Sequence, residues 1–144
     1  MSRGDLAVVD RELVLRKLAD LDQYVTQMGE FRGVTPEEYR EDWKTQRIIE
    51  RTLQMAIEVC ADVANHIIAD RGLRMPSTYA EAFEVLADAG ILTAAQREAM
   101  VRMSGFRNLI VHEYARIDAA MVVRVLQERL GDFAAFKATI LRVL

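Results

Sequence analysis

The spacing of apolar residues constrains this fold more than any other feature, because it follows a helical period along most of the chain. The sequence holds only seven glycines and two prolines, and these fall between the periodic segments. No stretch sustains the two-residue alternation that a half-buried strand requires. We therefore expect an all-α, up-and-down helical bundle with short connections, in which residues 1–144 form a single domain.

Capping residues divide the first half of the chain into two predicted helices. The first runs from about Asp5 to Met28 and carries an apolar stripe. The second begins at Thr35, which Glu38 joins in a capping box, and meets no breaker before Gly72. Such a helix is on the order of 50 Å long, which is more than a compact bundle of this size needs. Either part of it packs on another subunit or a kink divides it.

Three further helices are expected in the second half. A short helix spans about residues 76–90. The next begins with a capping box formed by Thr93 and Gln96, and its predicted end lies near residues 104–105. The last begins at Asp118, a favourable N-terminal cap, and continues toward the end of the chain.

Composition and charge exclude several classes of protein. No apolar run approaches the roughly 18 residues that span a bilayer, so we expect no membrane segment. The single cysteine, Cys60, excludes an internal disulfide and indicates a cytoplasmic setting. A net charge of −3 argues against a broad nucleic-acid-binding surface. Residues 97–144, however, carry eight basic and five acidic side chains, which indicates either a local anionic ligand or merely uneven solvated faces.

Residues 107–114, with the sequence RNLIVHEY, carry the groups most suited to chemistry. An arginine and a histidine, here Arg107 and His112, are the minimum equipment for cleaving an RNA phosphodiester without a metal. An imidazole moves protons near neutral pH. A guanidinium stabilises the charge that develops on the phosphoryl oxygens. The segment is therefore a candidate active site.

Helix geometry places these side chains on different faces. Five residues separate Arg107 from His112, so the two diverge by about 140° on one helix, whereas Asn108 and His112 are neighbours. A two-fold dimer would solve this problem by placing identical segments against each other. The alternative is that Arg107 and His112 make ordinary surface or capping contacts. Tyr114 is either an aromatic anchor or an exposed phenol available for hydrogen bonding or modification.

A metal site is a weaker alternative. Glu58, Asp62 and His66 share one face of the second predicted helix, and carboxylates with an imidazole can bind a metal. Di-metal bundles usually carry paired Glu-x-x-His motifs, and this chain has no such pair. Its only other histidine is His112. A polar seam or a buried, salt-bridged Asp62 is favoured, so no metal site is expected.

The chain resembles the HEPN superfamily, specifically the HepT-like toxins. Residues 107–114 match the Arg-x4-His-x-Tyr signature of that group. Upstream, residues 56–68 are similar to the long second helix of the family, and residues 72–92 to the loop and helix that follow it. The resemblance covers roughly residues 45–120 with order and spacing preserved, whereas the first 35 residues add only helicity.

This resemblance implies a helical bundle that forms a homodimer, with Arg107 and His112 of both chains meeting in an interfacial cleft. Proteins of this kind are metal-independent endoribonucleases that use no cofactor. By resemblance, His112 would be the general acid or base when the ribose 2′-hydroxyl attacks the adjacent phosphate. Arg107 would stabilise the pentacoordinate charge, and Asn108 would hold the RNA substrate or the imidazole.

The resemblance also implies a protein partner, a minimal nucleotidyltransferase antitoxin. Such a partner would neutralise the toxin by transferring AMP to the tyrosine of the signature, here Tyr114. Added AMP brings negative charge and bulk next to an RNA-binding cleft, which would repel the phosphate backbone. The alternative is a non-catalytic HEPN interaction module whose main role is to bind the nucleotidyltransferase.

Overall fold

The computed structural model describes residues 3–144, with side chains from Arg11 onward. Within that range the chain forms helices joined by turns, with no strand, in agreement with the predicted all-α bundle. The elements are α1 (Arg3–Gly29), α2 (Pro36–Glu41), α3 (Trp43–Asp70), α4 (Tyr79–Asp88), α5 (Ala94–His112), the 3-10 turn η1 (Tyr114–Arg116), α6 (Ala119–Arg124), the π-helical segment η2 (Val125–Arg129) and α7 (Leu130–Val143).

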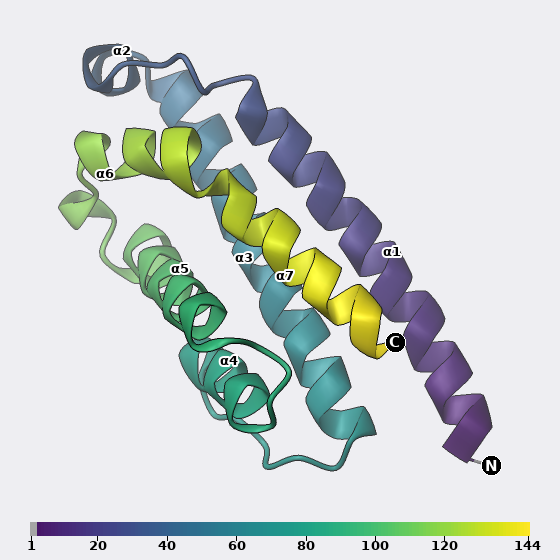
Figure 1. Cartoon of the computed structure of the whole chain (residues 1–144). Helices are drawn as coiled ribbons and strands as arrows, with labels where there is room; N and C mark the ends of the chain where they lie inside the picture. Colours follow the sequence, from purple (N-terminus) through teal and green to yellow (C-terminus); the bar gives the residue numbers. More distant parts are fainter. Residues whose placement is uncertain (1–2) are drawn as a thin grey trace.

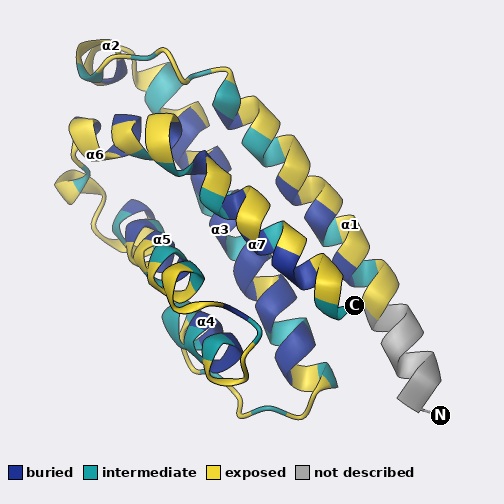
Figure 2. Ribbon diagram, viewed as in Figure 1, coloured by how far each residue is buried: buried dark blue, intermediate teal, exposed yellow. Residues whose placement is uncertain are grey.

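The helix α3 is the centre of the bundle, since it packs against α1, α2, α4, α5 and α7 (Figure 1). Buried residues recur along its length (Figure 2). Opposite it, the ring of Phe83 in α4 meets the ring of Phe136 in α7 edge to face, with the centroids 5.8 Å apart. Burying one such side chain stabilises the fold by about 1.5–3 kcal/mol. The core therefore holds α5 firmly between α3, α4 and α7.

The sequence predicted one helix from Thr35 to Gly72, or a helix divided by a kink. The first prediction is wrong and the second is confirmed, because the chain forms two helices there, α2 and α3. Asp42 has an extended backbone, with φ −117° and ψ 99°, and it ends α2 and begins α3. Its carboxylate accepts hydrogen bonds from the backbone N–H groups of Lys44 and Thr45 at 3.0 and 3.3 Å. A short acidic side chain competes for backbone donors in this way and favours a cap over a helix interior.

The predicted helix end near residues 104–105 is also wrong, because α5 continues without interruption to His112. The Ser104 hydroxyl donates to the carbonyl of Val101 at 2.6 Å, and Gly105 adopts a helical conformation. Phe106 is buried beside it, so packing outweighs the helix-breaking tendency of a serine and a glycine. The consequence is that the whole motif up to His112 lies on a single helix.

The starts of α5 and α6 follow the capping residues in the sequence, whereas the last predicted helix is interrupted by η2, and no side chain caps the start of η2 or of α7. Thr93 and Gln96 form the expected reciprocal capping box, and Asp118 caps α6 by accepting from the N–H of Ala120. At Thr35 only half of the predicted box is present, since its hydroxyl accepts from the N–H of Glu38. Among the described residues, no helix is both long enough and apolar enough to cross a membrane.

Candidate active site

Arg107 is held where α5 packs against α3 and α4. Its Nε and Nη2 atoms donate to Oε2 of Glu58 at 3.1 and 2.7 Å. Its guanidinium also lies over the ring of Tyr79, 4.6 Å from the centroid. The Arg107 side chain is only 15% exposed. An ion pair with stacking on one side fixes the direction of the guanidinium, which is what a group that must meet a phosphate needs.

Asn108 lies beside this arginine and not against the imidazole. Nη1 of Arg107 donates to Oδ1 of Asn108 at 3.3 Å. The two residues share a shallow pocket of about 330 Å³ with Asn65 of α3 and the turn at residues 76–78. This pocket is polar and open, and the guanidinium forms part of its wall. An anionic group in this pocket would meet the guanidinium of Arg107.

His112 is the last residue of α5 and is exposed to solvent. Within one chain the structure does not bring it to Arg107, because both residues lie on one continuous helix and diverge by about 140°. The geometric difficulty inferred from the sequence therefore holds in the fold.

Tyr114 begins η1, directly after α5, and is 43% exposed. Its hydroxyl accepts a hydrogen bond from Nη1 of Arg47, which is on α3. The Arg47 guanidinium also lies 4.9 Å from the centroid of the Tyr114 ring. Sequence reasoning missed Arg47, since 67 residues separate the two and an exposed arginine on a helix gives no signal of its own.

A buried polar pair continues inward from Arg47. The Tyr39 hydroxyl donates to Oε2 of Glu50, and Nη1 of Arg47 lies 3.9 Å from Oε1 of the same carboxyl. Burial raises the pKa of Glu50 above its ordinary value, although Tyr39 and Arg47 act in the opposite direction. Burial, followed by the hydrogen bond to Glu50, also raises the pKa of Tyr39. Next to this pair a pocket of about 380 Å³ opens beside Tyr114.

The three residues considered for metal binding are engaged in other ways. Glu58 pairs with Arg107, and Oδ2 of Asp62 lies 3.5 Å from Nζ of Lys17. In the part of the chain that the structure describes, no three histidine, cysteine, aspartate or glutamate side chains are arranged to hold a metal ion. A common ligand set of Glu58, Asp62 and His66 is therefore not formed. The ion pair expected for Asp62 is present, but the expectation that Asp62 is buried is wrong, because its side chain is 53% exposed.

Comparison with known proteins places this arrangement in context. The family described as ribonuclease HepT-like matches residues 21–140. The mRNA nuclease HepT of Shewanella oneidensis is 28% identical over 125 residues, which cover 87% of this chain and 93% of that protein. The tRNA nuclease HepT of Aphanizomenon flos-aquae is 26% identical over 128 residues, which cover 89% of this chain and 87% of that protein.

The fold has the same neighbours among solved structures. The tri-AMPylated HEPN toxin of Shewanella oneidensis, in complex with MNT antitoxin, superposes with a TM-score of 0.83 at 28% identity. That superposition covers 90% of this chain and 96% of the toxin. The likeness thus includes nearly the whole helical bundle and the helix that carries the candidate site.

Proposed function

The chain belongs to the ribonuclease HepT-like family, and from that premise we propose that it is the toxin of a toxin–antitoxin pair, a metal-independent endoribonuclease. The observation that carries the proposal is the intact pair of Arg107 and His112 on α5, in a fold that matches a HEPN toxin. Arg107 is oriented and largely enclosed, whereas His112 is exposed to solvent. These are the properties that a charge-stabilising group and a proton carrier require.

The proposed reaction is attack of the ribose 2′-hydroxyl oxygen on the adjacent phosphorus. His112 accepts the 2′-hydroxyl proton while the new P–O bond forms. Arg107 stabilises the negative charge on the pentacoordinate phosphorus. The bond to the 5′-oxygen breaks, and that oxygen takes up a proton. The products are a 2′,3′-cyclic phosphate and a 5′-hydroxyl, so atoms and charge balance without a metal or cofactor.

A homodimer completes this site in the proposal. A two-fold axis near the end of α5 would bring Arg107 of one copy to the side of His112 in the other, which one helix alone does not do. The second imidazole would then be available to protonate the leaving 5′-oxygen. Light scattering at micromolar concentration is expected to give twice the monomer mass. A monomer that retains full activity would contradict a composite site.

Tyr114 is the proposed acceptor of AMP from a nucleotidyltransferase antitoxin. The Shewanella oneidensis toxin is tri-AMPylated in its complex with MNT antitoxin, and Tyr114 occupies the tyrosine position of the signature here. The Tyr114 side chain is partly exposed, with its hydroxyl accepting from Arg47, so a partner can approach it from solvent. We also place this system in the cytoplasm. Supporting this, Cys60 is a free, fully buried thiol whose pKa is raised by burial.

The test is cleavage of a mixed cellular RNA pool, in the presence of EDTA, by the unmodified chain. His112→Ala and Arg107→Ala are each expected to reduce the cleavage rate by at least about a hundredfold. His66→Ala is the matched control, because it removes the other histidine of the chain. Absence of cleavage by a folded, unmodified dimer that binds its antitoxin tightly would favour the non-catalytic interaction module.

A further inference from the structure

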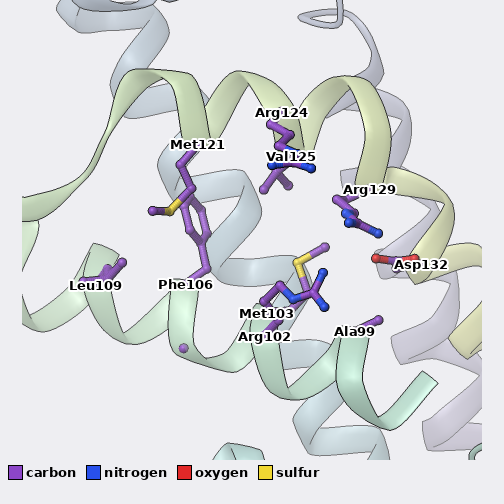
Figure 3. Close-up of a pocket in the computed structure, with 11 residues that line it drawn as sticks. Ala99, Arg102, Met103, Phe106, Leu109, Met121, Arg124, Val125, Arg129 and Asp132 are labelled. Atoms are coloured by element: carbon purple, nitrogen blue, oxygen red, sulfur yellow. The ribbon is translucent and has the colours of Figure 1, made fainter. Parts of the chain in front are cut away.

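A groove of about 630 Å³ separates α5 from the α6–η2 segment (Figure 3). Two facing helical segments line this groove: α5 contributes Phe106 and Leu109, and the α6–η2 segment contributes Met121 and Val125. These apolar side chains form the floor. Three arginines surround it, namely Arg102, Arg124 and Arg129. An apolar floor with guanidinium groups around it is suited to a ligand that is both planar and anionic.

The groove leads toward the candidate catalytic histidine. Seven residues return a helix to within about 20° of the same direction, so Arg102 and Leu109 share one face of α5, as do Gly105 and His112. Three of these four residues line the groove, and His112 continues their stripe about 4.5 Å beyond Leu109 along the axis. Arg107 points away from this stripe, toward Glu58. A ligand in the groove therefore reaches His112 along the surface of a single helix.

The π-helical segment explains why two arginines face the same groove. In an α-helix Arg124 and Arg129, five positions apart, would diverge by about 140°. The π-helix closes hydrogen bonds between residues five apart, which brings such residues into line. Both arginines accordingly line the groove, with Val125 beneath them. Single π turns within α-helices occur often at functional sites, and this one assembles a cationic wall.

The charges at the groove remain available to an anion. Nη2 of Arg102 pairs with Glu98 at 2.9 Å, and Nε of Arg124 with Glu128 at 3.0 Å. Both pairs are solvent-exposed contacts along one helix, and such pairs are weak enough to exchange for a phosphate. Asp132 is the acidic residue of the groove wall, against three arginines. Glu98 and Glu128 lie outside the lining, so an anion that displaces them from Arg102 and Arg124 meets an excess of positive charge in the groove itself.

We propose that this groove binds the single-stranded RNA segment next to the scissile phosphate, with a base on the accessible apolar side chains of Leu109 and Met121 and phosphates on Arg124 and Arg129. The inference rests on the proposed ribonuclease function and deepens it. A base has a face that packs on apolar and aromatic side chains whatever its identity, and its phosphates are carried by arginines. The groove would therefore hold single strands with little sequence preference and guide them to His112.

The experiment measures binding of a short, fluorescein-labelled, single-stranded RNA by fluorescence anisotropy. Every 2′-hydroxyl of the RNA is methylated, so the probe has no nucleophile and remains intact. The double variant Arg124→Ala/Arg129→Ala is expected to lose at least about tenfold in affinity. Each lost phosphate contact also lowers the slope of log K against log salt by about 0.7, so the slope falls by about 1.4. A purely structural role would leave the slope unchanged.

A second variant fills the groove without changing any charge. A Cβ atom built at Gly105 meets no other atom within 4 Å, and Gly105 lines the groove. Gly105→Phe is therefore expected to fold and to reduce RNA affinity by about tenfold. Gly105→Ala also raises the helix propensity, by more than Gly105→Phe does, but occupies little space, so it is the control for the effect of volume. Arg16→Ala/Arg142→Ala removes two exposed arginines of α1 and α7 and is expected to change affinity less than about twofold.

Three results would overturn the proposal while the ribonuclease function stands. The first is that the unaltered chain cleaves RNA while the groove variants bind the probe as tightly as it does. The second is an equal loss for Arg16→Ala/Arg142→Ala, which would indicate non-specific attraction. The third is that the groove variants bind the probe normally but no longer bind the antitoxin, or have the mass of a monomer in light scattering. Either result would make the groove a protein interface. An unaltered chain that neither binds nor cleaves RNA would overturn the proposed function and this inference together.

Discussion

Both hydrogen bonds from Arg107 to Glu58 end on the same carboxylate oxygen, Oε2, although the two residues are 49 positions apart. Gln54 also approaches this oxygen, with Nε2 at 3.4 Å. The contact joins α5 to α3 at the point where the candidate active site begins. Glu58 therefore positions the guanidinium of Arg107. The proposed reaction requires no proton transfer to or from Glu58.

Glu58→Gln is expected to slow RNA cleavage by about tenfold at saturating substrate, because a neutral amide holds the guanidinium less firmly. The free energy of unfolding should fall by only about 1 kcal/mol, since Glu58 is partly exposed and solvent screens the pair. Single-turnover cleavage and thermal melting measure the two effects. Glu37→Gln, which removes an exposed ion pair with Arg40, is the control. Faster cleavage by Glu58→Gln would show that Glu58 restrains Arg107 instead of aligning it.

Arg47→Ala is expected to slow AMP transfer to Tyr114 by about tenfold. The transfer forms a bond from the phenol oxygen to the α-phosphorus of ATP and releases pyrophosphate, while the phenol proton leaves to a base. Arg47 donates to that oxygen and so stabilises the charge that develops there as the proton leaves. Mass spectrometry of the intact chain with antitoxin and ATP follows each added AMP.

A second substitution at Arg47 separates a charge effect from a structural one. Arg47→Lys keeps the positive charge and should restore the rate of AMP transfer only in part, since an ammonium does not lie flat on the ring. Arg51→Ala, one helical turn away on the exposed side of α3, is the control. Tyr114→Phe should abolish AMP transfer. Transfer to this variant would show that the acceptor is another residue.

Glu50 should make stability depend on pH in an unusual direction for an acidic residue. Burial raises its pKa above 4.5 in the folded chain, so the protonated form is favoured there. Its contribution is fully present below pH 4.5 and is lost as the pH rises through the folded-state pKa. Melting temperatures of Glu50→Gln, relative to the unaltered chain, should therefore increase between pH 4.5 and neutrality. Glu12→Gln, exposed on α1, is the control, and a difference independent of pH would contradict the assignment.

Asp42→Ala is expected to lower the melting temperature and the helix content seen by circular dichroism, because α3 loses its N-terminal cap. Hydrogen bonds from Thr45 lower the pKa of Asp42, so the contribution is present above 3.8, its ordinary value, and is lost as the pH falls below it. Asp42→Asn should retain most of the stability at neutral pH, since asparagine also caps well. Equal losses for both variants would argue against capping.

Local signals in the sequence predicted the fold well. The helical period and the caps at Thr93 and Asp118 are confirmed, because a cap depends on neighbours within three residues. The predicted helix boundaries near Asp42 and Gly105 were wrong, and both errors have a similar cause. At Asp42 a side chain captures backbone donors, and at Gly105 the packing of buried neighbours keeps the helix intact. In both places the outcome depends on competition between local propensity and tertiary contacts, which periodicity does not resolve.

The surroundings of the candidate site were less accessible to sequence reasoning. Arg107, His112 and Tyr114 could be named from one short segment, but their partners lie far along the chain. Glu58 was considered as a metal ligand, and the structure instead pairs it with Arg107. Arg47 had no signal at all. Contacts between separate helices depend on the rotation and register of each helix, and a pattern within one segment contains neither.

Because α5 is unbroken, the rate of the proposed reaction should depend on the concentration of the protein itself. Because one rigid helix holds Arg107 and His112 apart, no loop movement within a chain can join them. In the proposed composite site, an encounter between two chains supplies both groups to one phosphate. Turnover per molecule should then fall steeply once the toxin is diluted below its own dissociation constant. Freshly made toxin would stay harmless at low copy number and become destructive only when its level rises.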